Sequence, residues 1–197
     1  MKKRIYFDKF GELRFISHLD TLRFMDRLLK KCHIPVKYSQ GFHPRPRISL
    51  GNPVSLGTAA YNEVMDIVLE VPMTDEKLLE MLNSSGVIGF KVNKVETVED
   101  KSSITDIFIN ALFEVSGNTE DMNKLFDLLS QDEIIERKEK KDKVTERNLK
   151  ERIIDFSRDG DIIKIELVNI SPNSYLSLVN IKIEDVNIKK LGYKLND

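Results

Sequence analysis

The sequence has 197 residues, of which 41% are hydrophobic and 32% are charged, and its formal net charge is −1. This length allows one large or two small domains, and the composition excludes a disordered chain. No apolar run approaches the roughly 20 residues of a membrane-spanning helix. No apolar segment follows the basic start "MKKR", so we expect no signal peptide and a cytoplasmic location.

Taken in chain order, the first elements are a strand and a capped helix. Residues 2–8 alternate as a strand does, and we expect "GELRFI" at 11–16 to extend it. A helix should begin after Ser17, with Asp20 in the capping-box position, and end before Pro35. Helical spacing predicts a buried face made of Leu19, Leu22, Met25, Leu28, Leu29 and Cys32.

Residues 36–60 lack a regular period and should be irregular. A strand at 61–71, a helix capped by Thr74 and a strand at 88–98 follow, and the polar stretch 99–105 is typical of a domain boundary. Beyond it we expect a strand, a helix, one long charged hairpin, a short helix and a closing strand at 106–116, 118–131, 133–170, 173–181 and 185–195.

This order of elements predicts an α+β fold. A strand–helix–strand–strand–helix–strand succession occurs twice, which indicates two tandem ferredoxin-like (β-α-β-β-α-β) units with antiparallel sheets. We place the first unit at residues 1–100 and the second, acidic unit at 101–197.

Charge is distributed unevenly along the chain. Residues 1–50 hold 12 lysines and arginines against 4 aspartates and glutamates, a balance of +8, and the remaining residues carry −9. The near-neutral chain therefore has a basic first segment, which suits an anionic partner.

Two basic features lie in this segment. Arg23, Arg27 and Lys30 share one helix face, which is either a solvated face paired with Asp20 and Asp26 or an anion-binding stripe. The segment "SQGFHPRPR" at 39–47 contains two prolines, which predict a semi-rigid polyproline-II-like arm, although an ordinary hairpin tip is the alternative. Guanidinium groups match phosphate, and exposed rings can stack on unpaired bases. We predict RNA or anion binding by Arg23, Arg27, Lys30, Gln40, Gly41, Phe42, His43, Arg45 and Arg47.

Enzyme and metal signatures are absent from the sequence. It has no glycine-rich nucleotide motif, no G-x-S-x-G and no H-E-x-x-H. Its three histidines lack zinc-ligand spacing, and a single cysteine excludes a disulfide or a cysteine-ligated cluster within the chain. His18 is a candidate acid or base, although such a histidine more often packs or caps a helix. Glu63 and Asp66 form an acidic pair that a basic neighbouring strand would also explain.

Two motifs within residues 4–72 carry a resemblance that covers the whole chain. "RFISHLD" at 14–20 and "YSQGFHPRPRIS" at 38–49 resemble the radical SAM-linked protein family, a bacterial family of unknown function fused to or encoded beside a radical SAM protein. The family's loop is closer to S-Q-G-F-N-P-H-P-K, so this sequence departs from it at His43, Arg45 and Arg47. His18 matches the family's S-H-L-D histidine.

The resemblance implies a radical SAM protein as partner, which would carry the iron–sulfur cluster and SAM, whereas this chain would hold no cofactor. The family's gene neighbours imply an RNA-related role, in tRNA or rRNA modification. We therefore expect an RNA-binding accessory protein rather than an enzyme. Two alternatives stay open: a pure protein-docking subunit, and a metal-independent RNA-processing enzyme similar in fold to Cas6-type proteins and using His18.

Overall fold

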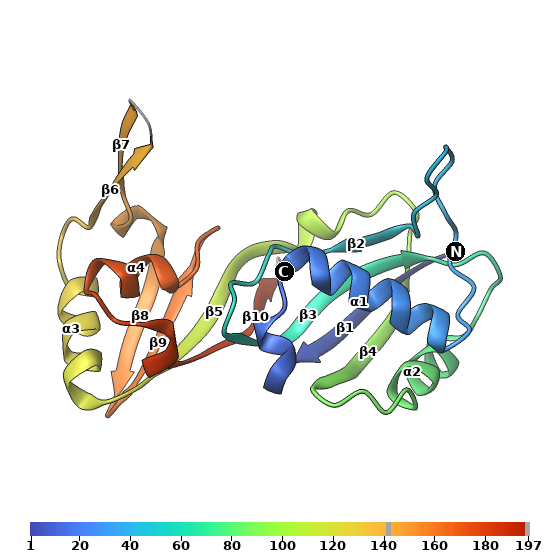
Figure 1. The fold of residues 1–197 in the computed structure, drawn as a ribbon, viewed down its shortest axis with the longest axis horizontal. Helices are drawn as coiled ribbons and strands as arrows, with labels where there is room; N and C mark the ends of the chain where they lie inside the picture. Colours follow the sequence, from blue (N-terminus) through green and yellow to red (C-terminus); the bar gives the residue numbers. More distant parts are fainter. Residues whose placement is uncertain (141–142, 196–197) are drawn as a thin grey trace. The chain divides into compact units, whose positions relative to one another are not determined.

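The computed structural model describes residues 1–140 and 143–195 of the chain (Figure 1). These residues form a mixed α+β structure with four α-helices and mostly antiparallel strand pairs. Residues 1–108, together with Leu195, make one compact unit, and residues 109–194 make a second. No helix within the described residues is long and apolar enough to cross a membrane.

The first unit is an antiparallel sheet covered by two helices. Its strands lie in the order β4-β1-β3, and β2 also pairs with β3. Both helices start at a predicted cap, because the hydroxyls of Ser17 and Thr74 accept from Asp20 N and Lys77 N. The elements are β1 (Lys2–Lys9), α1 (His18–Lys31), β2 (Ile48–Leu50), β3 (Thr58–Val68), α2 (Asp75–Asn83) and β4 (Phe90–Val98).

One core fills the space between this sheet and its helices. Alternate strand residues point to opposite faces of a sheet, so Ile5 and Phe7 of β1 face the helices. They pack against Met25, Leu28 and Leu29 of α1, which are buried as their helical spacing predicted. The same cluster contains Met65 and Ile67 of β3, Leu78 and Leu82 of α2, and Val92 and Val95 of β4.

The opposite face of β1 carries a buried ion pair. Arg4 lies directly across from Asp66 of β3, and its Nε and Nη2 donate to Asp66 Oδ1 and Oδ2 at 2.8 and 3.0 Å. Lys2 Nζ lies 3.0 Å from Asp66 Oδ2. Hydrogen bonding to Asp66 raises the pKa of Arg4. Asp66, one member of the acidic pair noted in the sequence, is therefore explained by its ion pair with the basic neighbouring strand.

The second unit combines an antiparallel sheet with a separate hairpin. Its sheet has the order β10-β5-β9-β8, and β6 pairs with β7 alone (Figure 1). Met122, Leu125 and Leu129 of α3 pack into a core with Tyr175. The elements are β5 (Phe108–Ser116), α3 (Thr119–Leu129), β6 (Ile135–Lys140), β7 (Lys143–Asn148), β8 (Ile153–Asp159), β9 (Ile162–Leu167), α4 (Asn173–Leu178) and β10 (Asn187–Leu195).

Two sequence-based expectations about these elements are wrong. The segment 11–16 does not extend β1 but forms a 3-10 helix, Gly11–Phe15, because Gly11 takes a φ of +58° and turns the chain. The segment 133–170 is two hairpins rather than one. Asn148 breaks it, since its side-chain oxygen accepts from the backbone N–H groups of Ile134 and Lys150, and the buried Leu149 follows.

Two tyrosines should titrate late. Burial raises the pKa of Tyr6 and of Tyr175 to about 12, and at Tyr6 the hydrogen bond to Glu96 adds to this effect. The phenol of a tyrosine in an unfolded chain has a pKa of about 10. Both pKa values are raised in the folded protein, so the two neutral phenols stabilise the fold fully below about pH 10. This stabilisation is lost as the pH rises through about 12.

This expectation can be checked by alkaline titration followed through ultraviolet absorbance and circular dichroism. Tyr6→Phe and Tyr175→Phe should each remove one late-titrating phenol and reduce the loss of stability at high pH. Ionisation of all the tyrosines together near the ordinary pKa, in a chain that is still folded, would contradict it.

Candidate functional site

The helix α1 lies on the sheet in a rotation that differs in part from the predicted one. Met25, Leu28 and Leu29 are buried as expected, but Leu19 is 63% exposed and Leu22 is half-buried. The N-terminal part of α1 thus presents Leu19 and part of Leu22 away from the core. Cys32 caps the helix, and His33 follows with a φ of +53°, so the chain leaves the helix before Pro35.

The cations of α1 have different surroundings. Arg23 Nη1 lies 2.8 Å from Asp20 Oδ1, and Lys30 Nζ lies 2.8 Å from Asp26 Oδ2. The hydrogen bond that Lys30 donates to Asp26 raises the pKa of Lys30. At Asp20, a hydrogen bond from Ser17 and then one from Arg23 lower the pKa. Arg27 makes no ion pair with the residues that the structure describes.

Residues 37–47 form a paired hairpin, which we call the finger. Tyr38 lies opposite Pro46 in an antiparallel bridge. Ser39 N donates to Arg45 O at 2.8 Å, and Arg47 N donates to Lys37 O at 2.8 Å. Gly41, in the turn at the tip, has a φ of +133° with open space around its α-carbon, so its backbone conformation and not crowding favours glycine. The finger stands out from the first unit between α1 and β2 (Figure 1).

This pairing replaces the expected polyproline-II-like arm. Pro44 and Pro46 have no N–H to donate, but the alternate positions do. Arg45 N donates to Ser39 Oγ at 3.0 Å, and Arg47 N donates to the opposite strand. The prolines therefore fall at positions where a hairpin needs no donor, and the finger is stiffened both by its rings and by its hydrogen bonds.

The side chains of the finger are exposed. Phe42 at the tip is fully exposed (103%), and Gln40, His43, Arg45 and Arg47 are exposed as well. Neither arginine of the finger forms an ion pair within the described residues. Both guanidinium groups can therefore bind an anion without first breaking an internal pair.

A groove between α1 and the finger brings part of the predicted site together. Arg23 and Lys30 come from α1, and Arg45 comes from the finger. Lys30 Nζ lies 5.9 Å from the centre of the Tyr38 ring. The groove is lined by Leu19, Leu22, Arg23, Asp26, Lys30, Tyr38, Pro44, Arg45, Pro46 and Ile48. We call it the α1–finger groove.

The remaining predicted residues lie outside this groove. Arg27 lines a second, neighbouring groove with Arg23 and Phe24. Gln40, Gly41, Phe42 and His43 belong to the tip of the finger, and Arg47 to its base, and none of them lines the α1–finger groove. The sequence prediction missed Leu19, Tyr38 and Ile48 as groove residues. The sequence held no signal for Leu19 as a groove residue, because it shares the helical spacing of the buried positions.

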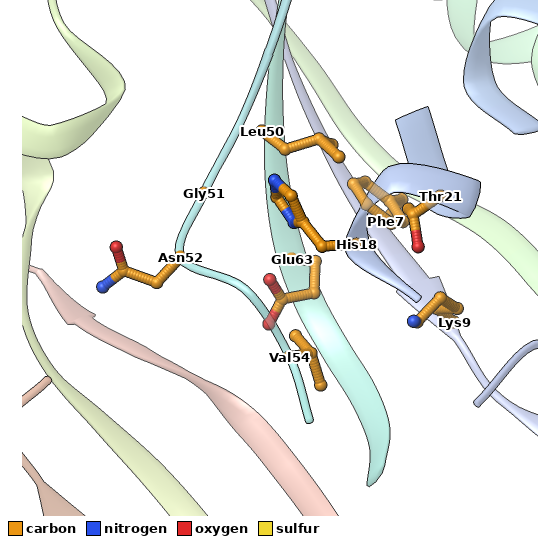
Figure 2. A pocket seen from close by; sticks show the side chains of 9 residues that line it. All are labelled: Phe7, Lys9, His18, Thr21, Leu50, Gly51, Asn52, Val54 and Glu63. Carbon is orange, nitrogen blue, oxygen red and sulfur yellow. The ribbon is translucent and has the colours of Figure 1, made fainter. Parts of the chain in front are cut away.

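His18 lies in a separate small pocket beside the start of α1. Figure 2 shows its ring between Leu50 and Glu63, with Lys9 entering from β1. Lys9 and Glu63 are only 4% and 5% exposed. Burial lowers the pKa of Lys9, and the charge of Glu63 opposes this shift. Sequence reasoning singled out His18 and Glu63 separately but not Lys9, because their meeting depends on strand register.

Across residues 1–140 and 143–195, no group of three or more histidine, cysteine, aspartate or glutamate side chains could hold a metal ion.

The structure thus defines an α+β protein with an exposed basic finger and a groove beneath it. The chain belongs to a bacterial family described as "Uncharacterized protein conserved in bacteria (DUF2344)", whose sequence profile matches residues 2–185. No curated protein matches the chain. The matched range includes α1, the finger and most of the second unit.

Proposed function

We propose that this chain is an RNA-binding protein that uses the finger and the exposed face of α1. The ordered and exposed basic finger is the observation that most supports RNA binding. It is held by its own backbone hydrogen bonds, and it presents two arginines, Arg45 and Arg47, that form no ion pair with any described residue. The ring of Phe42 at its tip is fully exposed. Guanidinium forks bind phosphate oxygens, and an exposed ring stacks on a base. A finger that is already ordered loses little entropy on binding.

The proposed partner is a radical SAM protein, and the RNA is tRNA or rRNA. Support for this part comes from the resemblance of residues 14–20 and 38–49 to the radical SAM-linked family. Cys32 is the sole cysteine, so the partner would hold the iron–sulfur cluster and SAM, while this chain would recognise the RNA.

For the fold, we infer two tandem ferredoxin-like units. The order β4-β1-β3-β2 in the first unit and the order β10-β5-β9-β8 in the second support this assignment. The β6–β7 hairpin is then an insertion between α3 and β8 of the second unit.

The double substitution Arg45→Ala/Arg47→Ala tests the RNA-binding role. Labelled tRNA and rRNA fragments should bind the wild-type chain, and this binding should weaken with salt because phosphate contacts release counterions. Two contacts to a single strand predict about a sevenfold loss of affinity between about 50 and 200 mM salt. The double variant should bind weakly at both concentrations and lose most of this salt dependence.

Lys77→Ala/Lys91→Ala is the matched control, because it removes two charges from exposed positions elsewhere on the first unit. It should leave the affinity nearly unchanged. No RNA binding by the wild-type chain at low salt would reject the proposal. Capture of the radical SAM protein by the wild-type chain but not by the double variant would then identify the finger as a protein-docking arm.

A second candidate function, metal-independent RNA cleavage, rests on the polar pocket where His18 lies with two buried charged side chains. The same RNA can be incubated with the chain in the presence of a metal chelator. Fragments that form with the wild type but not with His18→Ala would favour this candidate over simple binding.

A further inference from the structure

We propose that the α1–finger groove holds an unpaired RNA strand, with its bases against the apolar wall and its phosphates at the basic rim. This inference rests on the proposed RNA-binding role and names the form of RNA that the site selects. Three features of the groove carry it: its apolar wall, its charges and its length.

The wall of the groove is apolar and open to solvent. Leu19 is 63% exposed and Tyr38 is 42% exposed, while Leu22 and Ile48 are half-buried beside them. Pro44 and Pro46 add two ring faces. An unpaired base has an apolar face to lay on such a wall, whereas a duplex keeps its base faces stacked inside the helix.

The rim of the groove is basic. Arg23, Lys30 and Arg45 line it, and Asp26 is the one carboxylate among the lining residues. Arg23 and Lys30 are each held by a neighbouring aspartate on α1, but Arg45 has no such pair within the described residues. These three cations complement the negative charge of a phosphate backbone. Arg45 would make the first phosphate contact, and Arg23 and Lys30 would contact other phosphates along α1.

The length of the groove suits more than one nucleotide. Leu19 and Lys30 are both lining residues, and the 11 helical steps from one to the other correspond to about 16 Å of helix. Lys30 also lies over the Tyr38 ring, so a cation and an aromatic face occur at the same end. A strand along α1 can thus place a phosphate at Lys30 and a base at Tyr38 together.

Affinity for a labelled oligouridine, compared with a blunt-ended RNA duplex of equal phosphate number, tests this inference. The wild-type chain should prefer the single strand. Tyr38→Ala should lower the affinity for oligouridine by about tenfold or more, as expected for the loss of one stacked base, and should leave duplex binding nearly unchanged. Phe15→Ala is the matched control, because Phe15 is an exposed aromatic residue of the same unit outside the groove.

Asp26→Asn gives an opposite and independent readout. It removes the carboxylate that pairs with Lys30 without shortening the side chain, so oligouridine affinity should rise by about twofold or more. A fall in affinity would contradict the inference. This variant also keeps the test decisive if Tyr38→Ala does not fold.

The outcomes separate the inference from the proposed function. Equal binding of oligouridine and duplex, with no effect of Tyr38→Ala, would overturn the groove assignment but keep the finger as an RNA-binding element. Binding of neither RNA would overturn the proposed function. Displacement of oligouridine by an oligoglutamate of equal charge would overturn the RNA assignment and make the groove a docking site for an acidic protein segment.

Discussion

Replacement of Asp66 by alanine should lower the free energy of unfolding by about 3–5 kcal/mol, because it leaves the buried guanidinium of Arg4 without its partner. The side chains of Arg4 and Asp66 are 5% and 2% exposed, and two hydrogen bonds join them. A charge that is buried and unpaired cannot recover its hydration in the folded state. Urea unfolding of the full chain, followed by circular dichroism, measures the loss.

Two comparisons show whether the buried charge is the cause. Arg4→Met/Asp66→Leu removes both charges and should be more stable than Asp66→Ala alone. Asp26→Asn breaks a pair whose cation is well exposed and should change the unfolding free energy far less. If the double variant were as unstable as Asp66→Ala, packing rather than charge would explain the loss.

Gly89→Ala should be the most damaging single-methyl substitution among the glycines whose surroundings are described. Gly89 has a φ of +83°, and an added Cβ would overlap the backbone carbonyl oxygen of Phe10. Phe10 N also donates to Gly89 O at 2.9 Å, so neither backbone can move aside without losing this bond. The left-handed conformation alone costs about 1–2 kcal/mol in a non-glycine residue, and the overlap adds to it.

Gly86→Ala is the matched control for this effect. Gly86 has a φ of +68°, but an added Cβ would meet no atom within 4 Å. It should therefore cost only the conformational part, about 1–2 kcal/mol. Thermal or urea unfolding of the two variants isolates the clash as their difference. Equal losses would show that the contact between Phe10 and Gly89 gives way easily, and that it does not fix the chain before α1.

Features that depend on neighbouring residues were predictable from the sequence. The predicted caps at Ser17 and Thr74 are confirmed. Such a cap can be predicted from sequence because the hydroxyl and the backbone N–H that it accepts from are only three residues apart. The buried positions Met25, Leu28 and Leu29 follow from helical spacing. The family membership also follows from sequence, since the matched profile spans residues 2–185.

Features that depend on long-range pairing were not predictable in this way. Leu19 shares the spacing of the buried residues, but it is exposed in the folded unit and lines a groove instead. The finger arises because Lys37, Ser39 and their partners meet across a turn, which a proline pattern alone does not reveal. Lys9 meets His18 and Glu63 only through the folding of β1, α1 and β3 together.

The position of Cys32 gives this chain a natural reporter. The one thiol in the sequence caps the C-terminal end of α1, is half-buried and packs against the first core. Burial raises the pKa of this thiol, so at neutral pH it reacts slowly with alkylating reagents while the helix is closed. Its alkylation rate therefore reports local opening of α1, the helix that forms one side of the groove. This rate can be measured on the natural sequence, because no cysteine needs to be introduced or removed.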